Sequence, residues 1–233
     1  MIDLLVFGPH PDDIEIGLGG TVARHASEGA AVVLCDLTEG ELSSNGTVEQ
    51  RRAEADAAAR ILGARARENL RWPDGGIEPT ADHLRDAVTV IRRWRPRTIA
   101  IPYWNDRHPD HVAASHVLRV AAFRSGLRRY GTDADPWRAD WLCYYFINDG
   151  AKPSFVVDVS AFYDRKRAAL DAYRSQFAPG ESSAVPTRLT APTFRQLVES
   201  RDAQFGALAG VAFAEGVVVR EPVVRSGLLK NAV

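Results

Sequence analysis

Two short segments of this chain combine histidines with carboxylates in a pattern suited to binding a metal. His10-Pro11-Asp12-Asp13 lies near the start, and His108-Pro109-Asp110-His111 lies much further along the chain. Three of the six histidines and an adjacent pair of aspartates are therefore candidates, with no cysteine among them. Nitrogen and oxygen donors in such a mixed set suit zinc, and iron, cobalt or manganese would also fit.

These residue types are sufficient for metal-assisted hydrolysis. A catalytic zinc site takes three protein ligands and leaves the fourth position to water, whose pKa falls to about 7. A carboxylate that does not bind the metal can act as general base on that water. A spare histidine can stabilise an oxyanion or protonate a leaving amine. The two motifs together provide His, Asp and His as ligands, with one Asp and one His to spare.

Each motif also has a structural interpretation when it is taken alone. The aspartates of the first could cap the following helix, and the second could simply begin a helix, since proline suits the first turn. Both structural interpretations become less favourable if the two motifs meet at one place in the fold. The other histidines, His25, His83 and His116, lie in helical stretches without partner motifs, and we expect them to be structural or solvated.

The rest of the chain predicts the elements that must position these motifs. Apolar runs predict strands at residues 2–7, 31–37, 69–72 and 98–103. Amphipathic stretches predict helices between and after them, at residues 17–28, 47–62, 82–94 and 110–123. Thr47 and Gln50 have the spacing of a capping box. The regular alternation of strand and helix is typical of an α/β domain with a parallel sheet.

The last third of the chain predicts additions to this sheet. Strands are expected at residues 141–147, 155–159 and 217–224, helices at 162–173 and 194–205, and a loop at 178–186. No linker or repeat divides the sequence, so we expect a single domain over residues 1–233. The predicted fold is a Rossmann-like, three-layer α/β/α arrangement with a mostly parallel sheet, of strand order 3-2-1-4-5 plus C-terminal additions.

This strand order predicts that the two motifs meet. Strands one and four are neighbours in it, and the crevice at their carboxyl ends is the topological switch point, where such folds bind ligands. The first motif follows strand one, and the second follows strand four. Coincidence at this crevice favours the metal site over the two separate structural interpretations.

Composition restricts the class of protein and of partner. Apolar residues make up 45% and charged residues 25%, which is ordinary for a globular protein. A formal charge of -1 gives no support for a nucleic-acid partner or an anionic membrane surface. Cys35 and Cys143 both lie in apolar runs, which favours a reducing compartment over a disulfide. The first apolar run is too short for a signal peptide or membrane span, so we expect a cytoplasmic protein.

The two motifs and their flanking residues resemble the signatures of the PIG-L/LmbE-like zinc N-deacetylases. The matching segments are Gly8-Pro9-His10-Pro11-Asp12-Asp13-Ile14-Glu15 and Arg107-His108-Pro109-Asp110-His111. Residues 38–47, 102–103, 106–107, 173–177 and 199–216 resemble the branch of the family that acts in bacillithiol biosynthesis. The similarity covers nearly the whole chain, and it is more specific for the family than for the substrate.

This resemblance implies roles for individual residues. Asp12 corresponds to the general base. His108 corresponds to a histidine that stabilises charge in the tetrahedral intermediate, with Asp110 as its orienting partner. The zinc ligands that the resemblance implies are His10, Asp13 and His111.

The resemblance also implies the class of substrate. Family members remove the acetyl group from the 2-amino group of a glucosamine, and the bacillithiol branch converts N-acetylglucosaminyl malate into glucosaminyl malate and acetate. Arg51 and Arg107 would pair with the malate carboxylates, although Arg51 could also be a solvated helix residue beside Arg52. The expected partners are a small amino sugar and further copies of the chain, in a trimer or hexamer. The substrate-binding residues expected are Glu41, Ser43, Asn45, Arg51, Tyr103 and Arg107.

One position departs from the family pattern. Some relatives use a C-terminal tyrosine near the metal, and Phe194 aligns there, although a phenyl ring cannot donate to an oxyanion. Tyr103 could replace that tyrosine or could be a core residue.

Two rival functions stay open. One is a deacetylase for another N-acetylglucosamine compound. The other is a non-catalytic, Rossmann-type binding module. The binding module is disfavoured because Gly17, Gly19 and Gly20 follow the two aspartates and do not form the spaced glycine fingerprint directly after the strand.

Overall fold

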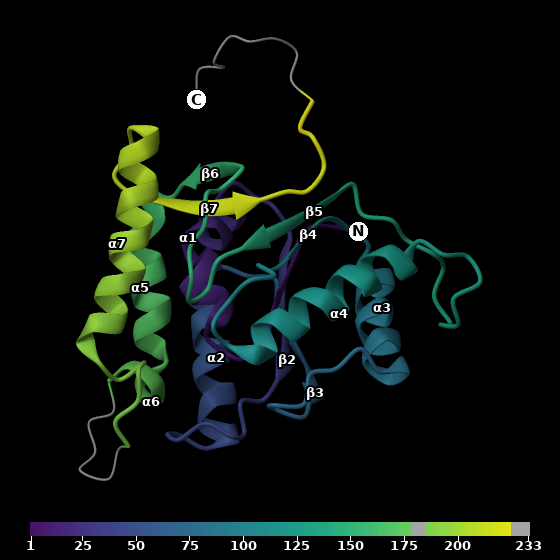
Figure 1. The fold of residues 1–233 in the computed structure, drawn as a ribbon, viewed down its shortest axis with the longest axis horizontal. Coiled ribbons are helices and arrows are strands. Elements are labelled where there is room, and N and C mark those ends of the chain that lie inside the picture. Colours follow the sequence, from purple (N-terminus) through teal and green to yellow (C-terminus); the bar gives the residue numbers. More distant parts are fainter. Residues whose placement is uncertain (179–184, 225–233) are drawn as a thin grey trace.

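The computed structural model describes residues 1–178 and 185–224, and the strands in these ranges form one sheet (Figure 1). Its seven strands are arranged in the order β3-β2-β1-β4-β5-β7-β6. The parallel strands are β1 (Ile2–Gly8), β2 (Val32–Thr38), β3 (Ala66–Trp72), β4 (Pro96–Pro102) and β5 (Trp141–Tyr145). β7 (Ala214–Val218) runs antiparallel to β5, and β6 (Phe155–Asp158) runs antiparallel to β7. The predicted order 3-2-1-4-5 with C-terminal additions is confirmed.

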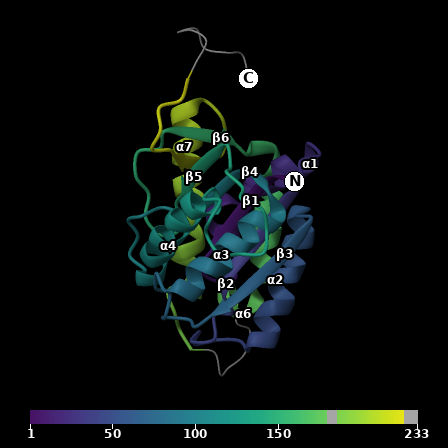
Figure 2. The ribbon, with the colours of Figure 1, turned by 90° about the vertical axis from the view of Figure 1, so that its right-hand side faces the viewer.

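Helices cover both faces of this sheet, as Figures 1 and 2 show. α3 (Ala81–Trp94) and α4 (Pro109–Ser125) lie on one face. The other face carries α1 (Asp13–Ser27), α2 (Val48–Leu62), α5 (Tyr163–Ala172) and the start of α7 (Pro192–Ala209). A short 3-10 turn (Ser160–Phe162) precedes α5, and the single turn α6 (Arg174–Phe177) follows it. This is the predicted three-layer arrangement.

The two faces have separate apolar cores because side chains alternate along each strand. In β1, Leu5 and Phe7 belong to the core beneath α3 and α4, whereas Leu4 and Val6 belong to the core beneath α1 and α2. A strand buried on both faces is apolar at nearly every position, which is why β1 shows no polar alternation and has Asp3 as its one charged residue.

Several element bounds differ from the sequence prediction by a few residues, and those of α1, β3 and β7 bear on the packing of the protein. α1 begins at Asp13 rather than residue 17, and its glycines permit close packing: a Cβ on Gly17 would lie 2.3 Å from the Tyr145 ring. β3 begins at Ala66 rather than residue 69, because the charge of Arg67 is paired inside the protein. β7 covers Ala214–Val218 rather than residues 217–224, since Glu215 is buried in an ion pair. Of the predicted loop at 178–186, residues 179–184 lie outside the described residues.

A buried group of charges, the Lys166 cluster (Lys166, Asp202 and Glu215), packs against α1. The Lys166 ammonium lies 2.6 Å from both carboxylates. α1 departs from helical geometry at Leu18, and the Glu215 carboxylate accepts hydrogen bonds from the backbone N–H groups of Gly20 and Thr21, at 2.9 and 2.7 Å. These charges therefore stabilise the helix whose first residue is Asp13.

Candidate metal centre

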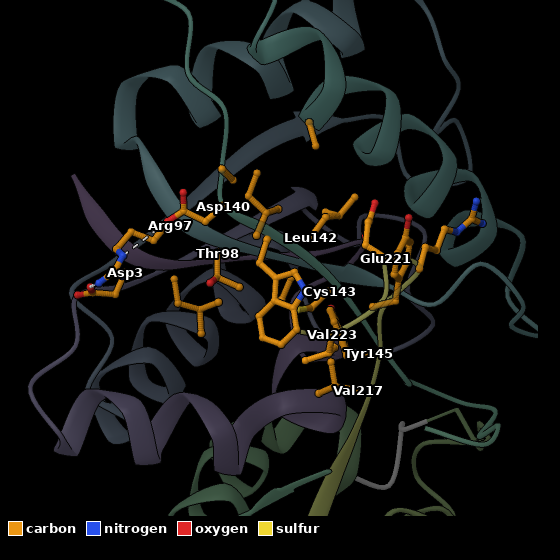
Figure 3. A pocket seen from close by; sticks show the side chains of 18 of the residues that line it. Asp3, Arg97, Thr98, Asp140, Leu142, Cys143, Tyr145, Val217, Glu221 and Val223 are labelled. Carbon is orange, nitrogen blue, oxygen red and sulfur yellow. Dashed lines mark ion pairs between the residues drawn. The ribbon is translucent and has the colours of Figure 1, made fainter. Parts of the chain in front are cut away.

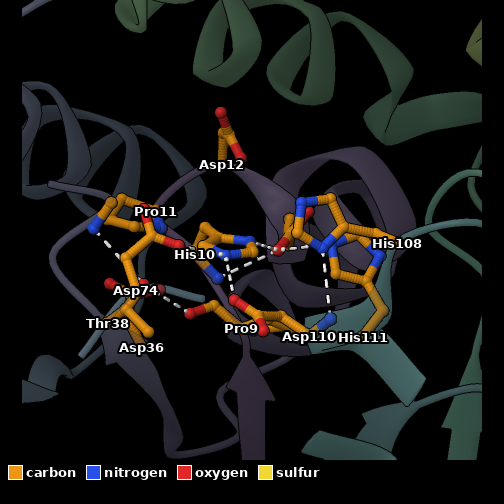
Figure 4. Close-up of polar contacts among 12 residues, drawn as sticks. Pro9, His10, Pro11, Asp12, Asp36, Thr38, Asp74, His108, Asp110 and His111 are labelled. Carbon is orange, nitrogen blue, oxygen red and sulfur yellow. Dashed lines mark hydrogen bonds and ion pairs between the residues drawn. The ribbon is translucent and has the colours of Figure 1, made fainter. Parts of the chain in front are cut away.

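The two histidine motifs meet at the carboxyl ends of β1 and β4, which are adjacent parallel strands. The ring centroids of His10 and His108 lie 4.9 Å apart, and those of His108 and His111 lie 4.7 Å apart. Figure 4 shows the three rings gathered beside Asp110. The predicted switch-point crevice thus brings together side chains from the start and the middle of the chain.

Asp13 lies between two ring nitrogens. Its Oδ2 atom is 3.0 Å from Nδ1 of His10 and 3.2 Å from Nε2 of His111. A tetrahedral metal centre with bonds of about 2.0–2.1 Å would separate its ligand atoms by about 3.3 Å. The spacing of these three buried groups therefore fits a single divalent ion.

In His10 and His111, the ring nitrogen that faces away from Asp13 is hydrogen-bonded to a carboxylate. Nδ1 of His111 lies 3.1 Å from Asp106. Nε2 of His10 lies 3.1 Å from Asp74 and 3.2 Å from Asp110. Metal-binding histidines commonly donate their second N–H to a carboxylate, which sets the tautomer and the ring orientation. This pattern leaves Nδ1 of His10 and Nε2 of His111 as the atoms directed toward Asp13.

The charges of this group are strongly interdependent. Burial alone would lower the pKa of His111, but Asp13 and Asp106 outweigh it and raise that pKa to about 9. Burial alone would raise the pKa of Asp13, but His111 and His10 hold it well below its usual range. The carboxylates around the two imidazoles favour a positive charge at this place. A metal cation bound by Asp13 and both rings would supply that charge.

Asp12 lies beside these groups in a different environment. It is buried, and its carboxylate accepts a hydrogen bond from Arg51 at 3.2 Å. In Figure 4 its side chain lies apart from the hydrogen-bonded cluster of histidines. Burial raises the pKa of Asp12 to about 7, against the lowering effect of Arg51. A carboxyl group with a pKa near neutrality is suited to accepting and returning a proton.

His108 is more exposed than the other two histidines. The backbone N–H of Asp110 donates to its Nδ1 at 3.2 Å, so the neutral ring carries its proton on Nε2. Burial of part of the ring, together with the neighbouring His111 and His10, lowers the pKa of His108. The Asp110 carboxylate accepts hydrogen bonds from His10 and from the backbone N–H of Gly75. Asp110 thus orients His108 through its backbone and His10 through its side chain.

The residues expected to bind substrate divide into two groups. Three of them support the loop at residues 39–46. Glu41 accepts a hydrogen bond from the backbone N–H of Asp74, and the Ser43 hydroxyl donates to the Asn45 carbonyl. The side-chain amide of Asn45 donates to and accepts from the backbone of Val185, at 2.8 and 2.9 Å. These side chains shape the loop through contacts within the protein.

The other expected substrate contacts lie elsewhere. Arg107 is exposed beside His108. Tyr103 is half-buried, with its ring packed on Trp104 and Phe146. Arg51 is buried, which excludes the interpretation of a solvated helix residue. Phe194 lies in the apolar core beneath α1, where its ring stacks near Phe177, so it is a packing residue.

Two residues of this centre were missed by the sequence analysis. Asp106 binds His111 and also accepts from the backbone N–H of His108, at 2.8 Å. Asp74 binds His10 and accepts from the backbone N–H of Leu42, at 3.0 Å. Asp106 could have been found as an acidic residue just before a histidine motif. Asp74 belongs to a sequence that indicates only a turn, and nothing local marks its contact with His10.

Comparison with known proteins identifies the family. Residues 5–122 match the PIG-L family, described as GlcNAc-PI de-N-acetylase. The chain belongs to this family. Its deacetylases depend on a metal, and the predicted enzyme class, a hydrolase of N-acetyl amides, is confirmed.

Individual relatives agree with this family assignment. The chain is 29% identical to a diacetylchitobiose deacetylase of Thermococcus kodakarensis, over 92% of this chain and 81% of that protein. It is 31% identical to 1D-myo-inositol 2-acetamido-2-deoxy-alpha-D-glucopyranoside deacetylase 2 of Saccharopolyspora erythraea, over 79% of this chain and 87% of the relative. Among solved structures, the conserved protein TT1542 from Thermus thermophilus superposes with a TM-score of 0.90 at 40% identity, covering 99% of this chain and 100% of its own.

A separate groove lies at the opposite ends of the strands. It has a volume of about 1070 Å³, and Arg97 and Thr98 at the start of β4 and Trp141 and Leu142 at the start of β5 are among its lining residues (Figure 3). None of the residues of the histidine cluster lines it. Within residues 1–178 and 185–224, no helix is both long and apolar enough to span a membrane.

Proposed function

We propose that this PIG-L family member hydrolyses the acetamide of an N-acetylglucosamine derivative, releasing acetate and a free 2-amino group. The arrangement of Asp13 between the two imidazoles, next to the buried Asp12, carries this proposal. The names of the two relatives support it, since both are deacetylases of sugars that carry an acetamido group.

We assign the metal to His10, Asp13 and His111 and propose zinc, with Fe²⁺ or Co²⁺ as alternatives. When bound, the ion would supply a Lewis acid that polarises the acetyl carbonyl and makes water more acidic. Asp106, Asp74 and Asp110 hold the outer ring nitrogens, so that the ligand atoms are oriented before any ion binds.

The protein's own groups carry the proton transfers. Asp12 accepts a proton from the water that attacks the acetyl carbon, and its pKa near 7 allows it to return this proton to the leaving nitrogen when the C–N bond breaks. His108 has an N–H at Nε2 with which to donate to the oxygen that becomes negative. Asp110 contributes by orienting His108 and His10.

We propose N-acetylglucosaminyl malate as the substrate within this class. The exposed Arg107 beside His108 could pair with a carboxylate of the aglycone, and residues 38–47 resemble the loop of the bacillithiol branch. A deacetylase for another N-acetylglucosamine compound is the alternative.

The test is acetate release from free N-acetylglucosamine, diacetylchitobiose and the malate glycoside, with and without a chelator. We expect the malate glycoside to react fastest and the chelator to abolish turnover. Equal rates on all substrates would refute the malate assignment. Activity on none, with no metal in the purified protein, would refute the deacetylase and favour the binding module. The cytoplasmic location and the trimer or hexamer stay predictions.

A further inference from the structure

We propose that Arg51 is a positioning residue for the base Asp12, rather than a binding residue for the carboxylates of the substrate. This inference rests on the proposed function, because it takes Asp12 to be the base. It replaces the role in malate binding that the family resemblance implies for Arg51.

The contacts of Arg51 are all with the protein's own segments around Asp12. Its Nη2 donates to the Pro11 carbonyl at 2.5 Å and to the Asp12 carboxylate at 3.2 Å, and its Nη1 donates to the Gly40 carbonyl at 3.1 Å. The side chain comes from α2 and is only 4% exposed. One guanidinium therefore connects the first histidine motif with the loop that follows β2.

These contacts leave no face of the guanidinium for a bidentate carboxylate. Such a carboxylate binds either across Nη1 and Nη2 or across Nε and Nη2, so both arrangements need Nη2. Both hydrogens of Nη2 are already directed at Pro11 and Asp12. A substrate carboxylate would have to break the contact with Pro11 or with Asp12 in order to bind in either bidentate arrangement.

The backbone at Asp12 explains why such support is needed. Asp12 has a φ of 115°, which is unfavourable for a residue with a side chain, and it occupies the N-cap position of α1 without a capping hydrogen bond from its side chain. Arg51 binds both the carbonyl that precedes this residue and the carboxylate that it carries. Conformations of this kind persist when surrounding contacts hold them, and here they direct a functional side chain.

Gly40 is adapted to the same contact. Its φ is 67°, and a Cβ at this position would lie 1.9 Å from Nη1 of Arg51. The loop therefore passes close against the guanidinium, and only glycine leaves room for it. Gly40→Ala would displace Arg51 without removing its charge.

The test compares Arg51→Lys and Arg51→Met with the matched control Arg52→Met. Arg52 is the next residue of the same helix, but it is exposed and paired with Glu39. We expect Arg51→Met to lower kcat about 10²-fold, with little change in KM and full metal content, and Arg51→Lys to recover part of the loss. The ratio of kcat/KM between the malate glycoside and free N-acetylglucosamine should stay constant. A higher KM confined to the malate glycoside would overturn the inference and restore the role in substrate binding.

A double-mutant cycle tests whether Arg51 acts through Asp12. If it does, adding Arg51→Met to the Asp12→Asn variant should lower kcat little or not at all. A double variant whose loss of kcat is the product of the two single losses would contradict the inference. Gly40→Ala should reproduce the kcat loss even if Arg51→Met fails to fold, and full activity in Gly40→Ala would count against the inference.

If the proposed function is wrong, the wild-type protein will release no acetate from any of the substrates. The contact between Arg51 and Asp12 can still be tested in that case. A second double-mutant cycle, with Gly40→Ala and Asp12→Asn, would be measured by thermal unfolding. Additive changes in unfolding free energy would refute the coupling between the loop, Arg51 and Asp12.

Discussion

Two buried groups of opposite charges, the Lys166 cluster and the candidate metal centre, differ in where their charges are directed. In the Lys166 cluster, the ammonium binds Asp202 and Glu215, the Tyr163 hydroxyl donates to Asp202, and Glu215 also binds the backbone of α1. Every charge there is directed at another group of the same protein. The cluster lies against α1.

In the candidate metal centre, by contrast, three potential ligand atoms converge on one another, and carboxylates are hydrogen-bonded to the outer nitrogens of the two rings. His10, Asp13 and His111 each present a nitrogen or oxygen to the same point. Burial of charge alone therefore does not mark a functional site in this protein. The proposed site is distinguished instead by the convergence of potential ligand atoms at the carboxyl ends of β1 and β4, the edge at which folds of this kind bind ligands.

Removing a metal ligand should have the largest effect. We expect His111→Ala to lose the bound metal, and with it all detectable deacetylation, because two ligands cannot hold the ion against water. Metal analysis of the purified variant measures this. His116→Ala, an exposed position on the same helix, is the control and should keep its metal. Undiminished metal affinity in His111→Ala would show that the ion binds elsewhere.

Removing the base should separate catalysis from metal binding. We expect Asp12→Asn to keep its metal and to lower kcat by about 10²–10⁴-fold, the usual contribution of general base catalysis. Steady-state kinetics beside metal analysis measure both quantities. Wild-type kcat in this variant would rule out the role of Asp12.

The Lys166 cluster should respond in the opposite way. We expect Lys166→Met to lower the free energy of unfolding by about 3–5 kcal/mol, because two buried carboxylates lose their counter-charge. The activity of the protein that remains folded should be nearly normal. Denaturant unfolding measures the loss, with the exposed Lys152→Met as control. A variant as stable as wild type would contradict the structural role of this cluster.

The smallest effect is expected for the carboxylates that are hydrogen-bonded to the proposed metal ligands. We expect Asp106→Ala to weaken metal binding by about 10–100-fold, since His111 loses the carboxylate that orients its ring. Competition with a chelator measures the affinity. The exposed Asp82→Ala should leave it unchanged, and an equal affinity in Asp106→Ala would mean that His111 is oriented by other contacts.

Much of the fold and of the candidate centre could be predicted from the sequence. The strand order and the two-faced layering follow from the regular alternation of apolar runs and helices. The meeting of the two motifs follows from that order, because adjacent parallel strands end at the same edge. The extent of β3 and β7 could not be predicted, since Arg67 and Glu215 look like surface residues until their buried partners are known.

The residue types for metal chemistry were therefore determined locally, within two four-residue motifs. The outer support of that chemistry depended on contacts between distant segments: Asp74 with His10, and Arg51 with Asp12. A hydrogen bond requires a distance and a direction, and the chain obtains both only after the strands and loops have packed. For this reason the sequence indicated what the site could bind, and only the fold showed which arginine is hydrogen-bonded to Asp12.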